Sequence, residues 1–115
     1  MAEKLVPIFR VTDGRASAAW YGRLGFGVVG EHRFAPDLPL YLFLRRGDEH
    51  LHLSEHTGDA PPGTLVYLYV DDVDAVAAEF GAEIVEQPWA REVHLTDPDG
   101  NHLRIGTAIP GDAAG

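Results

Sequence analysis

Alternating apolar and polar positions indicate several short strands. Residues 6–11 place Phe9 and Val11 on one face and Val6 and Ile8 on the other, the period-two pattern of a half-buried strand. Comparable segments cover residues 27–34, 40–45, 51–54, 65–70, 83–86, 93–96 and 102–105. The pattern therefore predicts a chain rich in strands.

Two segments carry helical spacing. In residues 16–24, Ala16, Ala19, Trp20 and Leu24 recur at helical intervals, and Gly25 can end the helix in a left-handed conformation. Thr12 or Asp13 can cap its first N–H groups. A shorter helix is predicted to follow Asp71 or Asp72 and to run through Phe80, with Gly81 ending it.

Glycine, proline and aspartate mark the connections. The predicted turns and loops cover residues 46–49, 57–63, 87–90 and 97–101, and residues 106–115 are expected to be a frayed tail. A strong turn signal is Asp97-Pro98-Asp99-Gly100-Asn101, in which Gly100 supplies a positive φ.

The second half of the chain repeats the first half at an offset of 59 residues. This offset superposes Asp13 on Asp72 and Val11 on Val70. Each copy is read as strand, helix and three strands, so the sequence predicts an α+β fold of two βαβββ units. We expect residues 1–115 to form a single domain, with module one at about 5–57 and module two at about 64–109.

Composition narrows the function classes. The 115 residues include no cysteine, which excludes disulfides and thiolate chemistry. No apolar run approaches the roughly 20 residues of a membrane span, and the N-terminus lacks the apolar region of a signal peptide. We therefore expect a soluble, cytoplasmic protein that does not bind membranes.

Charge is distributed unevenly. Residues 1–57 have no net charge, whereas residues 58–115 carry the whole net charge of −9. Nucleic-acid binding requires a basic surface, so it is disfavoured. An acidic half can attract a cationic ligand, although solubility alone also explains it.

Three segments resemble the vicinal oxygen chelate superfamily, which includes glyoxalase I, extradiol dioxygenases, fosfomycin-resistance enzymes and bleomycin-resistance proteins. Residues 10–26 are similar to the opening of that superfamily, and residues 97–101 to its closing turn. Residues 86–92, Glu-Gln-Pro-Trp-Ala-Arg-Glu, resemble a segment of the bleomycin-resistance proteins. The resemblance implies two βαβββ modules whose curved sheets surround a concave cleft, in a homodimer that shares its modules between subunits.

The resemblance also places the metal ligands of the superfamily. The corresponding positions are Val6, Leu65 and Arg104. Valine and leucine have no lone pair to donate, and arginine stays protonated in proteins. Metal catalysis of the family type is therefore disfavoured, and we expect no metal, no cofactor and no catalytic residue.

Histidines leave one alternative open. His50 and His52 share one face of a predicted strand at a spacing that suits zinc or copper, and His56, His94 and His102 lie elsewhere. These imidazoles can instead be scattered polar residues. Nucleophilic catalysis finds no support, because neither Ser17 nor Ser54 lies in a Gly-x-Ser-x-Gly elbow.

The strand faces opposite the helices combine flat apolar area with a few polar groups, as a small-molecule site requires. The candidate ligand-binding residues are Phe34, Tyr41, His52, Ser54, Tyr67, Tyr69, Trp89, Arg91, His94 and Arg104. Tyr67 and Trp89 are the first choices for stacking, followed by Phe34 and Tyr41. Each aromatic can alternatively pack at a dimer interface, and Trp20 is expected in the core or at an interface.

Three hypotheses follow. The first is a metal-free, non-enzymatic homodimer that sequesters a planar, possibly cationic, antibiotic-like small molecule. The second is a glyoxalase-like or dioxygenase-like enzyme whose metal is held by an unorthodox His site. The third is a scaffold or sensor domain that binds no drug.

Overall fold

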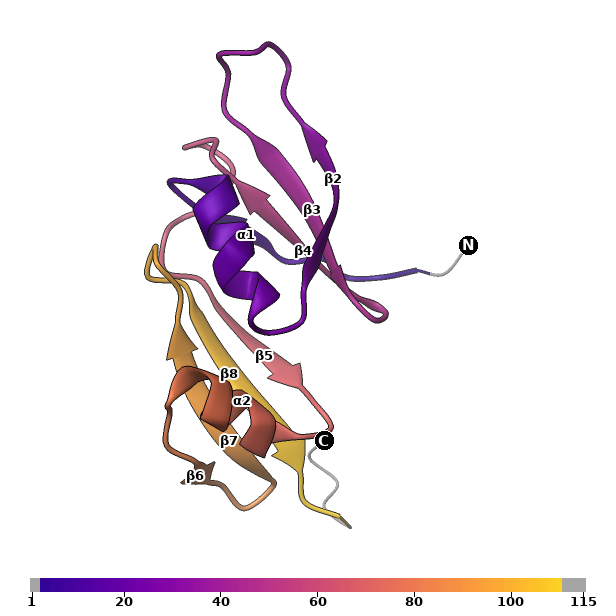
Figure 1. Ribbon diagram of the computed structural model, residues 1–115, viewed down its shortest axis with the longest axis vertical. Coiled ribbons are helices and arrows are strands. Elements are labelled where there is room, and N and C mark those ends of the chain that lie inside the picture. The colour runs from indigo at the N-terminus through magenta and orange to yellow at the C-terminus, as the bar shows by residue number, and fades with distance from the viewer. Residues whose placement is uncertain (1–2, 111–115) are drawn as a thin grey trace. The chain divides into compact units, whose positions relative to one another are not determined.

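The computed structural model describes residues 3–110, which form two compact units. The first unit comprises residues 3–64 together with Asp97–Asn101, and the second comprises Leu65–Thr96 and residues 102–110 (Figure 1). No helix within these described residues is long and apolar enough to cross a membrane.

The first module has the order strand, helix and three strands. It consists of β1 (Ile8–Arg10), α1 (Gly14–Gly22), β2 (Gly27–His32), β3 (Tyr41–Arg46) and β4 (Glu49–Ser54). The strands form a sheet in the order β1-β4-β3-β2, in which β1 pairs with β4 in parallel and the other pairs are antiparallel. Helix α1 covers one face of this sheet (Figure 1).

The second module repeats this topology. Its elements are β5 (Leu65–Tyr69), α2 (Val73–Phe80), β6 (Val85–Glu86), β7 (Ala90–Thr96) and β8 (His102–Ala108), and its sheet has the order β5-β8-β7-β6. The parallel pair is again the first strand with the last strand. The predicted α+β fold of two βαβββ modules is confirmed, each module having its own four-stranded mixed sheet.

The helix caps bear out the repeat. Asp13 caps α1 and accepts a hydrogen bond from the Ala16 N–H at 3.1 Å, while Asp72 caps α2 and accepts one from the Ala75 N–H at 3.2 Å. Both pairs are separated by the offset of 59 residues read from the sequence. Of the two cap candidates at each helix, the structure has Asp13 rather than Thr12 at α1, and Asp72 rather than Asp71 at α2.

Several predicted boundaries were wrong. Strand β7 begins at Ala90 rather than residue 93, and β8 continues to Ala108 although residues 106–108 were expected to belong to a frayed tail. Cross-strand pairing explains both extensions, because Ala90 pairs with Ala108 and Arg91 with Thr107. The strands predicted at 6–11, 27–34 and 83–86 are shorter than expected. The rest of the predicted tail, residues 111–115, lies outside the described residues.

The buried face of α1 also differs from the predicted stripe. Gly14, Ser17 and Tyr21 are buried, whereas Ala16 and Ala19 are exposed. The Tyr21 ring lies 6.0 Å from the Phe9 ring between centroids and 6.2 Å from the Phe26 ring. Small residues at 14 and 17 bring the helix close to the sheet, and a Cβ at Gly14 would lie 3.3 Å from a Leu42 methyl carbon. Two small residues and the buried Tyr21 ring, rather than the predicted apolar stripe, therefore form the packed face of this helix.

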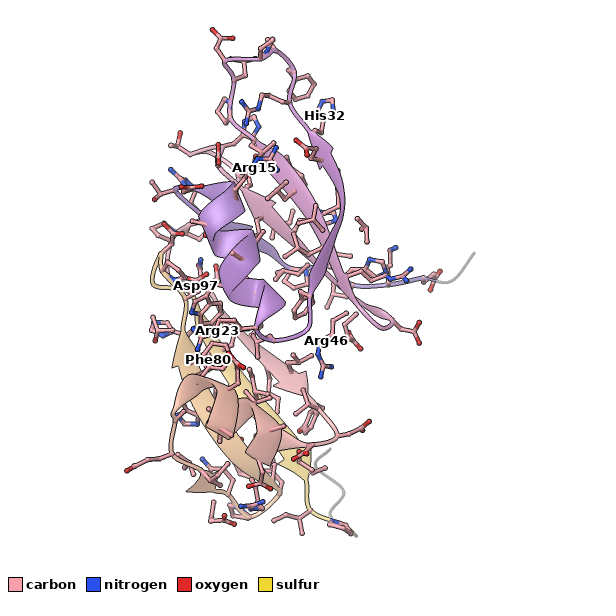
Figure 2. All side chains as sticks on the ribbon, viewed as in Figure 1. Arg15, Arg23, His32, Arg46, Phe80 and Asp97 are labelled. Carbon is pink, nitrogen blue, oxygen red and sulfur yellow. The ribbon has the colours of Figure 1, made fainter. Side chains whose placement is uncertain are left out.

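The turn predicted at residues 97–101 is confirmed, and it centres on the buried side chain of Asp97 (Figure 2). This carboxylate accepts hydrogen bonds from the Asp99 N–H at 2.8 Å, the Asn101 N–H at 2.9 Å and the Asn101 side-chain amide at 3.0 Å. The Tyr21 hydroxyl donates a fourth bond at 2.7 Å. Within the first unit, the turn is therefore fastened to α1 through the buried Asp97 and through the Ser17 hydroxyl, which donates to Asp99 at 3.2 Å.

Two helix-terminal glycines should respond oppositely to alanine. Gly81 caps α2 with φ of 62°, so Gly81→Ala is expected to reduce the free energy of unfolding by about 1 kcal/mol. Gly22 is the last residue of α1, and a Cβ there would meet open space, so Gly22→Ala should raise the free energy of unfolding by about 0.5–1 kcal/mol. Urea denaturation of the two variants checks both signs. A loss at position 22 equal to that at position 81 would contradict this account of the caps.

Candidate functional site

Three aromatic side chains cluster on the face of the first sheet opposite α1. Tyr41 and Phe43 project from β3 and His52 from β4, and we call them the Tyr41 cluster. The His52 ring centroid lies 5.2 Å from that of Tyr41 and 4.8 Å from that of Phe43. The Tyr41 hydroxyl oxygen lies 2.8 Å from His52 Nδ1. The sequence predicted Tyr41 and His52 at this site but missed Phe43.

Electrostatics favour the uncharged forms of this cluster. Burial, reinforced by the neighbouring His50 and Lys4, lowers the pKa of His52. Burial and the nearby carboxylate of Asp59 raise the pKa of Tyr41. A neutral imidazole with a free Nδ1 lone pair can therefore accept the Tyr41 proton in a hydrogen bond.

Ser54 and Phe34 do not join this cluster. Ser54 is fully buried, and its hydroxyl donates to Asp59 at 2.5 Å while accepting from the His56 N–H at 3.1 Å. Phe34 lies in the loop after β2, is 76% exposed and contacts the ring of His32, which Figure 2 labels. Ser54 thus fastens the segment that follows β4, and the structure leaves Phe34 apart from the other candidates.

The second sheet carries a tyrosine-rich surface opposite α2. It is formed by the exposed side chains of Leu65, Tyr67, Tyr69, His94 and Arg104, and we call it the tyrosine face. Arg104 on β8 pairs with Tyr67 on one side and with His94 on the other, which places these three residues in one row. The Tyr67 and Tyr69 ring centroids are 4.6 Å apart, with planes tilted by 40°.

A buried carboxylate organises this face. Glu92 is 1% exposed, and it accepts hydrogen bonds from the Tyr67 hydroxyl at 2.6 Å and from the Gln87 side-chain amide at 3.4 Å. Its other short contact joins Oε1 to His94 Nε2 at 2.9 Å. The Trp89 side chain acts to lower the pKa of Tyr67, so the two first choices for stacking lie near each other.

The pKa values of this network follow from its geometry. Burial raises the pKa of Glu92, but the hydrogen bonds from Tyr67, His94 and Gln87 together bring it below the ordinary glutamate value. Burial and the bond to Glu92 raise the pKa of Tyr67 to about 12. At neutral pH, Glu92 is therefore an anion and Tyr67 is a neutral donor.

Arg91 points away from the tyrosine face. It alternates with Glu92 along β7, and its guanidinium contacts Asp74 of α2 at 2.7 Å and Glu86 at 3.1 Å. Arg91 is thus the predicted site residue in the second module that the structure separates from Tyr67.

The candidate ligand-binding residues chosen from the sequence did not include Glu92 or Gln87. The signal for Glu92 was present, because an acidic residue in a strand between Ala90 and Val93 must either be exposed or find donors. The identity of those donors depends on the pairing of three strands, which alternation alone does not specify.

The positions that correspond to family metal ligands do not fit a metal ion. Val6 is half-buried, Leu65 is 53% exposed and Arg104 is exposed, and none of these side chains can donate a lone pair. In the part of the chain that the structure describes, no three His, Asp or Glu side chains are grouped as metal binding requires.

The fold matches solved structures of two binding proteins and of a resistance determinant. An antibiotic-binding protein from Streptomyces sp. CB03234 is 23% identical with a TM-score of 0.77, the match covering 95% of this chain and 98% of that one. A bleomycin-binding protein, solved with bleomycin, is 28% identical with a TM-score of 0.68, covering 92% and 98%. A bleomycin resistance determinant encoded on the transposon Tn5 is 26% identical with a TM-score of 0.65, again covering 92% and 98%.

Among proteins of curated function, none matches this sequence significantly. The family model described as "Glyoxalase superfamily protein" matches residues 1–112, which is almost the whole chain. Since the paired βαβββ modules and this match agree, the chain belongs to the glyoxalase superfamily.

Proposed function

We propose that this protein binds and sequesters a planar, antibiotic-like small molecule without a metal ion and without catalysis. The observation that carries the proposal is the exposed Tyr67–Tyr69 pair, held in place by the buried Glu92 network. The similarity to a bleomycin-binding protein at 28% identity and to a bleomycin resistance determinant at 26% identity supports it.

Physical chemistry makes the tyrosine face suitable for stacking. An aromatic pair contributes about 0.5–1.5 kcal/mol beyond the burial of its area. A ring already fixed by a hydrogen bond loses little further rotamer entropy when a ligand binds. The 2.6 Å bond from Tyr67 to Glu92 provides such fixation before any ligand arrives.

Charge favours a ligand with a cationic group. Glu92 is ionised at neutral pH, and two of its three partners, Tyr67 and Gln87, carry no charge. The net charge of −9 adds a long-range field that attracts cations. Cation–π contacts with the exposed tyrosine rings contribute a further 0.5–1 kcal/mol or so each.

The proposal includes a homodimer in the cytoplasm. Exposed apolar side chains remain on both modules, including Ile8 in the first and Leu65 in the second. A second copy of the chain would bury such residues beside the ligand, and a C2 dimer is the commonest arrangement among oligomers.

Tryptophan fluorescence tests the binding. Chelator-treated protein titrated with metal-free bleomycin and a panel of planar antibiotics should show saturable quenching, near one ligand per chain. Tyr67→Ala is expected to weaken binding about tenfold or more, because it removes a stacking ring and a donor to Glu92. Val29→Ala, at an exposed position on β2, is the control and should bind like the wild type.

The same titration distinguishes the proposed sequestration from the two alternatives. A metal-dependent enzyme with an unorthodox His site would respond only after zinc or iron is restored. A scaffold domain would give no response with or without metal. Either outcome would overturn the proposed sequestration.

A further inference from the structure

Gly106 occupies an unusual place on the tyrosine face. It lies on β8, the strand between β5 and β7, where it pairs with Tyr69 on one side and with Glu92 on the other. It is buried, and its backbone does not require a positive φ. Backbone conformation therefore does not explain a glycine at this position.

The side chain of Tyr67 explains it. Tyr67 is on β5, opposite Arg104, yet its hydroxyl bonds to Glu92 on β7, so the side chain must pass across β8. A Cβ at Gly106 would overlap the Tyr67 hydroxyl oxygen and lie 3.1 Å from Cζ and 3.3 Å from Cε1. The ring thus rests on the bare backbone of Gly106, and any side chain there would obstruct its path.

We infer that Gly106 is a positioning residue for the tyrosine face: the absence of a side chain opens the path by which Tyr67 crosses β8 to bond with Glu92. Its role in ligand binding rests on the proposed function, whereas its control of the Tyr67 position does not. Gly106 fixes the ring on which a planar ligand would stack.

The inference predicts a specific effect of a single methyl group. Alanine is no worse than glycine in a strand interior, so Gly106→Ala should act through the steric conflict with Tyr67. Displacing the ring breaks its bond to Glu92 and returns the phenol to water. A ligand must then order a mobile ring, and we expect about three- to tenfold weaker binding.

The pKa of the Tyr67 phenol reports the position of its ring, and its measurement requires no ligand. In protein with 13C-labelled tyrosine, Tyr67→Phe assigns the Tyr67 Cζ signal, which should titrate in the wild type near a pKa of about 12. In Gly106→Ala we expect this pKa to fall toward that of free tyrosine, because burial and the Glu92 bond are both lost. Gly27→Ala, a strand position with open space around it, should leave the signal unchanged.

A double variant guards against simple misfolding. If the conflict is with the hydroxyl, adding Tyr67→Phe to Gly106→Ala should recover part of the lost melting temperature. An unchanged Tyr67 pKa in Gly106→Ala, or no recovery in the double variant, would overturn the positioning role. If wild-type protein binds no ligand of the panel, the proposed function fails, and these two measurements still decide the role of Gly106.

Discussion

Asp97→Ala is expected to lower the free energy of unfolding by about 3 kcal/mol or more. The carboxylate is 5% exposed and accepts four hydrogen bonds, three from its own turn and one from Tyr21. Hydrogen bonds to a charged group contribute about 1.5–3 kcal/mol each, and a buried donor without a partner costs about 1–3 kcal/mol. Alanine removes the acceptor and leaves the buried Tyr21 hydroxyl without its hydrogen bond to Asp97.

Urea denaturation followed by circular dichroism measures this loss. Tyr21→Phe removes only the hydrogen bond from Tyr21 to Asp97, so its cost should be smaller, about 1 kcal/mol. Asp71→Ala changes an exposed acid and is the matched control, expected within about 0.5 kcal/mol of the wild type. If Asp97→Ala were no worse than Asp71→Ala, the turn would not depend on its buried acid.

Features encoded within a few residues could be predicted from the sequence. The capping aspartates, the left-handed Gly81 and the 97–101 turn each depend on contacts inside one short segment. The repeat at an offset of 59 residues then specified the topology, because two similar halves require the same order of elements. Strand ends and the extent and buried face of α1 were predicted wrongly, because they depend on distant contacts: Ala108, for example, pairs with Ala90, outside its own segment.

The site depended on contacts that the sequence pattern does not contain. Alternation correctly placed Tyr67, Tyr69, His94 and Arg104 on one face, because it needs only the period of a strand. It could not show that Tyr67 crosses a neighbouring strand, since that path requires Gly106 and Glu92 to be in register. The sequence pattern also could not show the partner of Arg91. That partner, Asp74, is on a helix that packs against the opposite face of the sheet.

Glu92→Gln should cost about 2 kcal/mol at neutral pH while preserving the shape of the side chain. The carboxylate is 1% exposed and receives hydrogen bonds from Tyr67 and Gln87, with His94 Nε2 at 2.9 Å. An amide carries no charge and turns an N–H₂ group toward one of these donors, so at least one charge-assisted bond is lost. Glu86→Gln is the control on the neighbouring strand; its exposed ion pair with Arg91 predicts a change of less than about 1 kcal/mol.

The pH dependence of the stability difference between the wild type and Glu92→Gln provides the sharper test. Glu92 has a pKa below its ordinary value in the folded protein, so its contribution to stability is fully present above that ordinary value. The contribution is lost as the pH falls through the lowered pKa of the folded state, because the carboxyl then binds a proton in both states. The stability gap between wild type and Glu92→Gln should therefore be constant near neutral pH and shrink below pH 4.5, the ordinary value for glutamate. A gap that grows on acidification would mean that burial, rather than the hydrogen bonds, dominates the ionisation of Glu92 and raises its pKa in the folded protein.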